Sequence, residues 1–341
     1  MIEKEKHVMI SPILKIIGDI DKIGHCKLGH LAKAFKYPIL HFDEESGLTV
    51  KVTEMRSLNT WLKHNLRMPR FYHHNVHLLE NGIAMTRDLP VCGKAILCVT
   101  DLDHSSPRLM WNPAFRRWSN MRFTKVGSLG THLEGVILLK LLEQGRALIH
   151  AGMVCRNNEA IIIHGLPNRG KTWTVLLLMH EGYNFMSEDV AIISNDGKAY
   201  ALPFTTSIKD LGEYKQYKQH KLRRTGKRIF FELADRVVVA DVCKPKTLVL
   251  LERGSNNRLS EVAPEEAARI ILATNRLEFN FPNHLLTLYC MAKGSSIYEY
   301  LEREKDIIKD FISHVRVFKI EFSEHSARDK AIRRLLIDDK E

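Results

Sequence analysis

The alternation of apolar and polar positions along the chain is clearest around residue 165. Residues 159–164 (EAIIIH) form a short, continuous apolar run that is typical of a buried strand. Residues 172–181 (TWTVLLLMHE) are mostly apolar over the length of a helix and are followed by Gly182, a favoured residue just past a helix end. The pattern therefore predicts a strand, a glycine-containing turn and a helix, in that order.

The segments before and after this strand, turn and helix show either the helical or the strand pattern of apolar residues. Asn195-Asp196-Gly197-Lys198 is typical of a hairpin turn, and Pro264 is favoured in the first turn of a helix. The pattern predicts helices over 133–145, 264–274, 297–314 and 327–337, and strands over 147–154, 184–194, 199–202, 237–242, 247–251 and 316–322. The strand over 184–194 is interrupted by the acidic pair Glu188-Asp189. We expect an α/β domain over residues 126–341.

Residues 1–125 give a mixed α+β pattern and are expected to form a separate N-terminal region of unassigned role. Strands are predicted over 48–52 and 95–99, and a helix over 58–66. Residues 111–125 (WNPAFRRWSNMRFTK) are aromatic and basic and contain Pro113 as a break. We interpret this stretch as a connecting or docking segment.

Composition narrows the class of protein. The 341 residues are 45% hydrophobic and 27% charged, which is ordinary for a soluble globular protein. No apolar run approaches the roughly 20 residues of a membrane span, and the N-terminus is a poor signal peptide. The six cysteines include no C-x-x-C pair, which suits a reducing cytoplasm and argues against a structural zinc site. These features predict a cytoplasmic protein without a membrane partner.

The chain is basic, with a formal net charge of +11, which favours anionic partners. Residues 214–228 (YKQYKQHKLRRTGKR) carry seven Lys or Arg and no acid, and are expected to be an exposed, mobile loop. It is either a solvated loop, a flap that contacts substrate or phosphate, or a groove for nucleic acid, the most weakly supported of the three. The residues that would bind substrate are Lys218, Lys221, Arg223 and Arg224.

The turn after residue 164 carries the phosphate-binding pattern G-x-x-x-x-G-K-[ST] at all its fixed positions. Glycines let the backbone approach an anion, and the loop N–H groups with the helix N-terminus face the phosphates. The lysine neutralises phosphate charge and the threonine hydroxyl ligates Mg²⁺. The predicted nucleotide-binding residues are Gly165, Leu166, Pro167, Asn168, Arg169, Gly170, Lys171 and Thr172.

Two further features could complete a phosphoryl-transfer site. Glu188 and Asp189 follow Thr172 by a spacing that returns the chain to the sheet edge where the phosphates would lie. One carboxylate could hold Mg²⁺ and the other could accept a proton from an attacking hydroxyl. His150 lies on the predicted neighbouring strand and is either a packed core residue or a group that contacts phosphate or assists proton transfer.

Residues 147–194 resemble the catalytic core of the HPr kinase/phosphorylase family. The shared features, in order, are His150, the loop Gly165–Thr172, Gly182-Tyr183 and Glu188-Asp189-Val190. The resemblance implies a P-loop kinase core of the HPr kinase/PEP carboxykinase-like type. It also implies ATP and Mg²⁺ as cofactors.

The resemblance assigns roles to the acidic pair. Thr172 and Asp189 would hold the metal, and Glu188, where the family usually has Asp, would be the base for a serine hydroxyl. The family's glycine-rich E-x-R-G-x-G segment has no counterpart after the acidic pair. We therefore expect a related kinase with an acceptor other than HPr, without the phosphorylase activity.

The sequence thus favours an ATP/Mg²⁺-dependent kinase that phosphorylates a hydroxyl, foremost a serine of a peptide or protein. A small-molecule hydroxyl kinase, a nucleotide-binding regulator without turnover and a nucleic-acid-acting protein remain as alternatives, and a homo-oligomer is compatible with each. The GTPase motif N-K-x-D and the transporter-type motif L-S-G-G-Q are absent.

Overall fold

The computed structural model describes residues 7–19, 47–65, 71–73, 75–89, 93–119, 129–202, 206–208, 221–225, 228–231, 241–279 and 284–336. The chain folds into two compact units. Unit 1 comprises residues 1–35, 42–144 and 280–303, and unit 2 comprises residues 36–41, 145–279 and 304–341.

This division differs from the boundary expected at residue 126. Helix α3 (Leu129–Glu143) and helix α6 (His284–Ala292) belong to unit 1 although both lie after that boundary. The reason is packing: α3 is apolar around almost its whole circumference, and its side chains are buried against β3 and α6. Residues 280–303 therefore belong to the same unit as residues 42–144.

Unit 1 is a mixed sheet with helices, so the region before residue 125 is α+β as expected. Its sheet has the strand order β1-β2-β3-β8-β7-β6-β5-β4. The strands are β1 (His7–Ser11), β2 (Leu14–Gly18), β3 (Leu48–Glu54), β4 (Phe71–His73), β5 (Val76–Leu79), β6 (Gly82–Leu89), β7 (Gly93–Thr100) and β8 (Arg108–Trp111). The first two helices of this unit are α1 (Leu58–Asn65) and α2 (Pro113–Ser119).

The segment over 111–125, interpreted as a connecting or docking stretch, is mostly buried over its described part. Trp111 ends β8, and Phe115 and Trp118 of α2 are buried and contact each other edge to face at 5.6 Å between ring centroids. Pro113 begins α2 rather than breaking a strand, because proline fits the first helical position. Asn112 caps the helix by accepting a hydrogen bond from the Phe115 backbone N–H at 2.9 Å. Residues 120–125 lie outside the described part of the chain.

Unit 2 is also built on a mixed sheet, whose central strands are parallel. Strand β11 (Glu159–Gly165) pairs in parallel with β18 (Val242–Arg253), which pairs in parallel with β20 (Arg316–Phe322). Around them lie β9 (Arg146–Ile149), β10 (Ala151–Arg156), β12 (Asn184–Ser187), β13 (Ala191–Ser194), β14 (Ala199–Tyr200) and β19 (Arg258–Glu261). The carboxyl ends of β11, β18 and β20 share one edge of the sheet.

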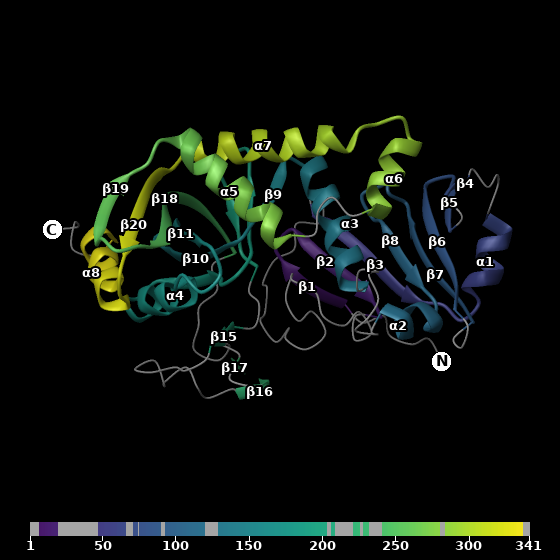
Figure 1. The fold of residues 1–341 in the computed structure, drawn as a ribbon, viewed down its shortest axis with the longest axis horizontal. Helices are drawn as coiled ribbons and strands as arrows, with labels where there is room; N and C mark the ends of the chain where they lie inside the picture. Colours follow the sequence, from purple (N-terminus) through teal and green to yellow (C-terminus); the bar gives the residue numbers. More distant parts are fainter. Residues whose placement is uncertain are drawn as a thin grey trace. The chain divides into compact units, whose positions relative to one another are not determined.

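Helices α4 (Lys171–His180) and α8 (His325–Leu336) pack on the same face of this sheet (Figure 1). Alternate residues of the parallel strands point to that face, as period-2 strands require: Ile161 and Ile163 from β11, Val249 and Leu251 from β18, Ile320 and Phe322 from β20. The core they form with α4 and α8 fixes the start of α4 at the sheet edge. Helix α5 (Pro264–Glu278) also belongs to this unit, and α7 (Ile297–Ser313) begins in unit 1 and ends in unit 2.

Several strand predictions differ from the structure at their boundaries; the run over 184–194, for example, forms two strands, β12 and β13, that pair with different neighbours. The strand expected over 147–154 is divided at His150, because β9 pairs with β13 whereas β10 pairs with β11 and β12. The run 247–251 belongs to the longer strand β18, which starts at Val242. Residues 237–240 lie outside the described residues.

Cys155 of β10 and Cys243 of β18 form a disulfide that joins the two strands on either side of β11. The scattered cysteines suited a reducing cytoplasm in the sequence analysis, where no disulfide was expected. The pairing arises because both residues lie opposite the beginning of β11, a proximity that spacing along the chain does not reveal. Cys98 and Cys290 are buried thiols.

None of the helices in the described ranges combines the length and the apolar character needed to cross a membrane.

Candidate phosphate-binding site

The predicted phosphate-binding segment lies at the carboxyl edge of the parallel strands. Strand β11 ends at Gly165 and α4 begins at Lys171, so the segment has the strand, turn and helix that the motif requires. Asn168 and Gly170 take positive φ angles of 63° and 91°. A Cβ on Gly165 would lie 2.9 Å from the Leu251 carbonyl oxygen, so the first glycine allows β11 and β18 to approach closely.

The turn is open to solvent on its outer side. Leu166, Pro167 and Asn168 are exposed, and Arg169 and Gly170 are partly buried. Helix α4 has no acidic residue in its first turn, and its N-cap is Gly170, which has no side chain to accept a hydrogen bond from the N–H groups of the helix start. A helix start with free N–H groups and no carboxylate in its first turn is suited to an anion.

Lys171 is buried beneath this turn and connects it to His150. Its Nζ donates to the carbonyl oxygen of Gly165 at 2.8 Å and lies 2.7 Å from His150 Nε2. Burial lowers the pKa of Lys171, and the negative charges of Asp189 and Glu188 oppose that shift. The ammonium is therefore held by acceptors at the place where phosphate charge would need neutralising.

His150 lies at the break between β9 and β10, not within a continuous strand. It is buried, and its Nδ1 is 3.5 Å from Asp189 Oδ1. Because a lysine ammonium can only donate, Nε2 of His150 accepts from Lys171 and the ring proton is placed on Nδ1, facing Asp189. His150 thus connects Lys171 to the second acid of the pair.

Glu188 and Asp189 occupy the bend between β12 and β13, with different surroundings. The Thr172 hydroxyl donates to Glu188 Oε1, and Glu188 is 9% exposed. The side chain of Asp189 is 52% exposed and lies on the His150 side. The bend thus places the pair beside the turn, and Glu188, rather than Asp189, is the acid bonded to Thr172.

His164, the last residue before the turn, is a buried neutral group. Within the described part of the chain neither ring nitrogen has a hydrogen-bond partner, and burial lowers its pKa to about 3, helped by the charges of Lys171 and His150. An uncharged imidazole at this position adds bulk under the turn without adding charge.

The basic segment 214–228 is only partly described. Lys218 lies outside the described residues. Lys221, Arg223 and Arg224 lie in strand β16 (Lys221–Thr225), where the structure describes only the backbone. Strand β17 (Arg228–Phe231) pairs antiparallel with β16 and with β15 (Thr206–Ile208). Where a mobile loop was expected there are strands, in keeping with the β-prone residues Ile229, Phe230 and Phe231.

Sequence reasoning missed Arg328, a buried residue of α8 that lies against the turn. A Cβ on Gly170 would lie 2.0 Å from its Nη1. A single arginine in a basic amphipathic helix carries no signal of such a contact, because the contact depends on how α8 packs on the sheet.

The oxygens near the turn fit a hard cation. Thr172, Glu188 and Asp189 offer one hydroxyl and two carboxylates, and Mg²⁺ binds a few protein oxygens while keeping water and phosphate oxygens as further ligands. The described residues contain no group of three or more His, Cys, Asp or Glu that could hold a metal by themselves. A magnesium ion here would therefore need nucleotide oxygens.

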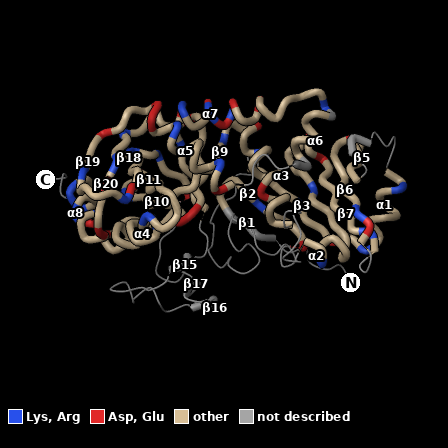
Figure 2. Tube along the Cα trace, in the orientation of Figure 1, with Lys and Arg blue, Asp and Glu red and all other residues tan. Residues whose placement is uncertain are grey.

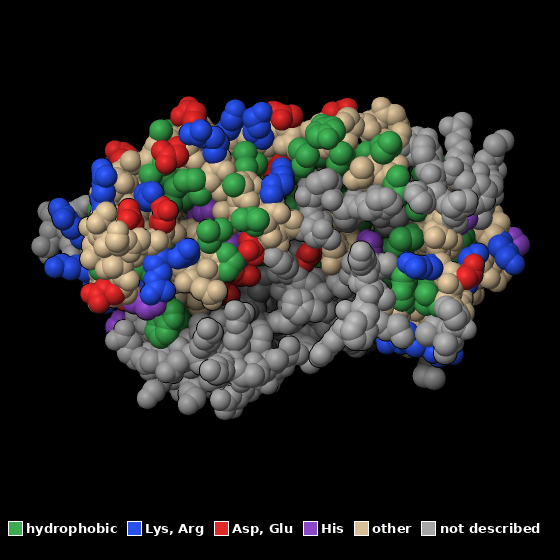
Figure 3. Space-filling view, viewed as in Figure 1, with side chains coloured by type: hydrophobic (Ala, Val, Ile, Leu, Met, Phe, Trp, Pro, Cys, Tyr) green, Lys and Arg blue, Asp and Glu red, His purple; other side chains and the backbone are tan. Residues whose placement is uncertain are grey.

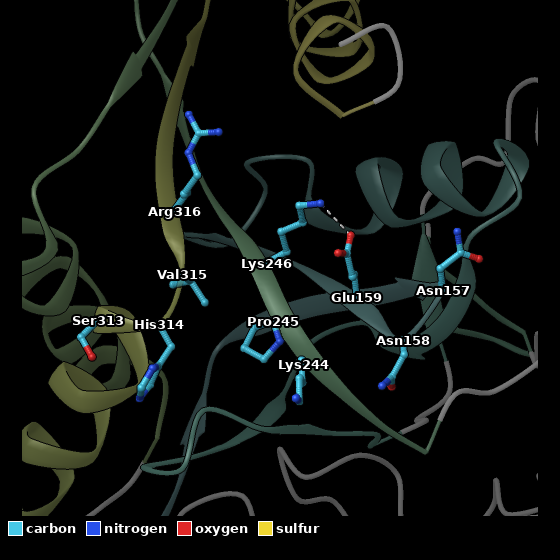
Figure 4. A pocket seen from close by; sticks show the side chains of 10 residues that line it. All are labelled: Asn157, Asn158, Glu159, Lys244, Pro245, Lys246, Ser313, His314, Val315 and Arg316. Atoms are coloured by element: carbon cyan, nitrogen blue, oxygen red, sulfur yellow. Dashed lines mark hydrogen bonds and ion pairs between the residues drawn. The ribbon is translucent and has the colours of Figure 1, made fainter. Parts of the chain in front are cut away.

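A separate hollow lies at the opposite edge of the sheet, at the amino ends of β11, β18 and β20 (Figure 4). Lys246 extends from β18 toward Glu159 of β11 and forms an ion pair at 2.9 Å. The residues that line the hollow are Asn157, Asn158, Glu159, Lys244, Pro245, Lys246, Ser313, His314, Val315 and Arg316. Because ligands of open α/β sheets bind at the carboxyl ends of the strands, this hollow is not part of the phosphate site.

Basic residues do not form one continuous stripe over the described trace. Figure 2 shows Lys and Arg interspersed with Asp and Glu in both units. On the face seen in Figure 3, acidic and basic side chains are mixed along α7. On the described part of this face, basic side chains therefore alternate with acidic ones.

Comparison with known proteins gives little. No protein-family model matches the chain, and no curated protein matches it. One solved structure that it is similar to is the Hpr(Ser) kinase/phosphatase from Coxiella burnetii, with a TM-score of 0.29 and 13% identity, over 57% of this chain and 99% of that chain. At that TM-score the likeness carries no weight for fold or activity.

Proposed function

We propose that this chain is an ATP- and Mg²⁺-dependent kinase that transfers a phosphoryl group to a hydroxyl, foremost a serine of a peptide or protein. The observation that carries the proposal is the meeting of Lys171, Thr172, His150, Glu188 and Asp189 at the start of α4. Phosphoryl transfer needs positioned cations, a metal and a proton acceptor more than covalent chemistry. This set of side chains offers a cation, oxygen ligands for a metal and a proton acceptor.

Lys171 and the turn would bind the nucleotide. The backbone N–H groups after Gly165 and at the start of α4 would face the phosphates, and the Lys171 ammonium would neutralise their charge. Mg²⁺, when bound, would supply further positive charge to the phosphates. Thr172 and Glu188, already joined by a hydrogen bond, would hold the ion and its waters.

Asp189 is the better placed proton acceptor. Its carboxylate is more exposed than that of Glu188, so an incoming hydroxyl can reach it, and His150 orients it from the other side. In the transfer, the acceptor oxygen forms a bond to the γ-phosphorus while the bond from that phosphorus to the bridging oxygen breaks. ADP leaves, and the hydroxyl proton passes to Asp189.

This division reverses the roles implied by the resemblance to HPr kinases, in which Asp189 would hold the metal and Glu188 would be the base. The hydrogen bond from Thr172 to Glu188 favours the reversal, because the metal-binding hydroxyl and the metal-binding acid need to be neighbours. The longer arm of glutamate, where the family usually has aspartate, accounts for its reach to Thr172.

The test is transfer of labelled phosphate from γ-labelled ATP to serine-containing peptides, with a panel of small hydroxyl compounds in parallel. The wild type should label an acceptor in the presence of Mg²⁺, and the Lys171→Ala variant should not. Labelling confined to small molecules would identify a small-molecule kinase. Tight ATP binding without transfer or hydrolysis would replace the kinase with a nucleotide-binding regulator.

A further inference from the structure

Arg328 is the most unusual buried residue outside the proposed site. It lies one turn into α8, on the side of the helix that carries Ile332 and Leu336 into the sheet core, and is only 1% exposed. Burying an arginine is costly unless its charge and its donors are satisfied. Its partners therefore indicate what the residue does.

Two of those partners come from α8 itself. Nε of Arg328 donates to Asp329 Oδ1 at 2.8 Å, and Nη1 lies 3.2 Å from His325 Nδ1. The guanidinium carbon is 5.9 Å from the centre of the Phe322 ring, at the end of β20. These contacts fix the guanidinium in one orientation at the carboxyl edge of the sheet.

On its remaining side the guanidinium lies against the phosphate turn. Nη1 occupies the space that a Cβ of Gly170 would need, at 2.0 Å from that ideal position. Gly170 is in the left-handed region, directly before the first helical residue, Lys171. Because a glycine has no Cβ, the guanidinium can pack directly against the backbone of the turn at this position.

We propose that Arg328 is a positioning residue that holds the Gly165–Thr172 turn in its phosphate-binding shape, so that α8 is part of the nucleotide site. Arg328 is too deeply buried to contact substrate itself, and it acts through Gly170. The part concerning nucleotide affinity rests on the proposed kinase function, whereas the part concerning the shape of the turn does not.

The test compares Arg328→Met and Arg328→Lys with Arg334→Met in the full-length protein. Methionine keeps length and apolar bulk but removes the donors and the charge, and lysine restores the charge without the planar fork. Arg334 is an exposed residue of the same helix and serves as the matched control. Asp329→Asn, which keeps Arg328 but loosens its anchor, provides a milder variant if Arg328→Met does not fold.

The first measurement is amide hydrogen exchange of residues 166–171 without nucleotide. Exchange should be faster in Arg328→Met and, to a smaller extent, in Asp329→Asn, and unchanged in Arg334→Met. If both test variants exchange like the control while folded, Arg328 does not position the turn. This outcome does not depend on whether the protein is a kinase.

The second measurement is ATP affinity and the separation of KM from kcat. Arg328→Met should raise the ATP dissociation constant about 10- to 100-fold, the scale found when a residue that orients ligand-binding groups without touching the ligand is removed, and Arg328→Lys should recover part of it. KM for ATP should change more than kcat, because the chemistry of Asp189 is untouched. Unchanged ATP affinity together with faster exchange would overturn the link to nucleotide binding. Failure of the wild type to bind ATP would overturn the proposed function instead.

Discussion

At the scale of single residues, two adjacent carboxylates have different surroundings. Glu188 is buried and accepts a hydrogen bond from Thr172, whereas Asp189 is half exposed and faces His150. Neighbours in a bend point in different directions, so adjacent acids need not share a role. Their positions near the turn could be predicted from spacing. The division between them could not, because it depends on side-chain direction.

We expect the two acids to respond differently to neutralisation. Glu188→Gln should weaken Mg²⁺-dependent nucleotide binding, whereas Asp189→Asn should leave binding near normal and slow transfer by about 10²-fold or more, the scale of general-base catalysis. Calorimetric titration of ATP with and without Mg²⁺, together with single-turnover transfer, separates the two effects. The opposite pattern would restore the roles that the family resemblance implies.

Lys171→Ala should abolish measurable nucleotide binding while the fold persists. The variant removes the ammonium beneath the turn, and water can replace it as the donor to the Gly165 carbonyl oxygen and to His150 Nε2. Calorimetry gives the affinity, and a thermal melt reports the fold. Lys246→Ala, at the opposite edge of the sheet, is the control. Equal affinity in wild type and Lys171→Ala would remove the turn from the mechanism.

At the scale of elements, the long amphipathic helices were the most predictable part of the fold, whereas helices α2 and α6 were not predicted. The amphipathic pattern placed α7 and α8 within a few residues of their observed bounds, and the alternation over 316–322 matches β20. The strand predicted over 147–154 missed the break at His150, because apolar residues continue on both sides of it. Sequence pattern shows burial, but it does not show which neighbour a strand pairs with.

Helix α3 contains a buried histidine that should make the protein sensitive to acid. Among the described residues neither ring nitrogen of His132 has a hydrogen-bond partner, and burial lowers its pKa from 6.5 to about 4. Between these values the unfolded state binds more protons than the folded state. Stability should therefore fall as the pH drops from 6.5 to 4, by about 1.4 kcal/mol per pH unit for this one group.

The variant His132→Phe keeps an aromatic ring beside Phe115 and removes the titration. Its free energy of unfolding, measured by denaturant titration at several pH values, should depend less on pH than that of the wild type. His104→Gln, at an exposed position, should behave like the wild type. The same pH dependence in His132→Phe and wild type would contradict this assignment.

The disulfide between β10 and β18 gives an element-scale prediction. It closes a loop with a sequence separation of 88 residues, so its loss should cost about 2–4 kcal/mol. Thermal melts with and without reductant should differ for the wild type. The Cys155→Ala/Cys243→Ala variant should show no such difference. Equal thiol labelling of the unfolded wild type with and without prior reduction would show that the bond does not form.

At the scale of the whole molecule, the chain passes between its units more than once. Residues 280–303 belong to unit 1, although they lie between segments of unit 2. The amino-acid composition does not change at the points where the chain passes from one unit to the other. The sequence therefore suggested a single boundary near residue 126. The assignment of a helix to a unit depends on which surface covers its apolar face, and α3 and α6 pack together in unit 1.

A chain shortened to residues 126–341 should therefore fold poorly. Within unit 1, Tyr289 and Lys293 bond to Asp103, each at 2.7 Å, and Leu286 and Cys290 are buried. Truncation would remove Asp103 and β6 and would expose the apolar side of α6. Size-exclusion chromatography and binding of an apolar dye should show association and exposed apolar surface. Asp103→Asn in the full chain, which breaks only the exposed pair, should remain monodisperse.

The contact between Gly170 and Arg328 has a consequence for how the protein is made. The two residues are 328 − 170 = 158 positions apart in the chain. At typical rates of synthesis the ribosome needs roughly 8–30 s to cover that distance. During that interval the nascent chain carries the whole phosphate-binding motif without the arginine that packs against it. Nucleotide affinity should therefore arise late, after α8 has been synthesised and has docked, and not when the motif itself leaves the ribosome.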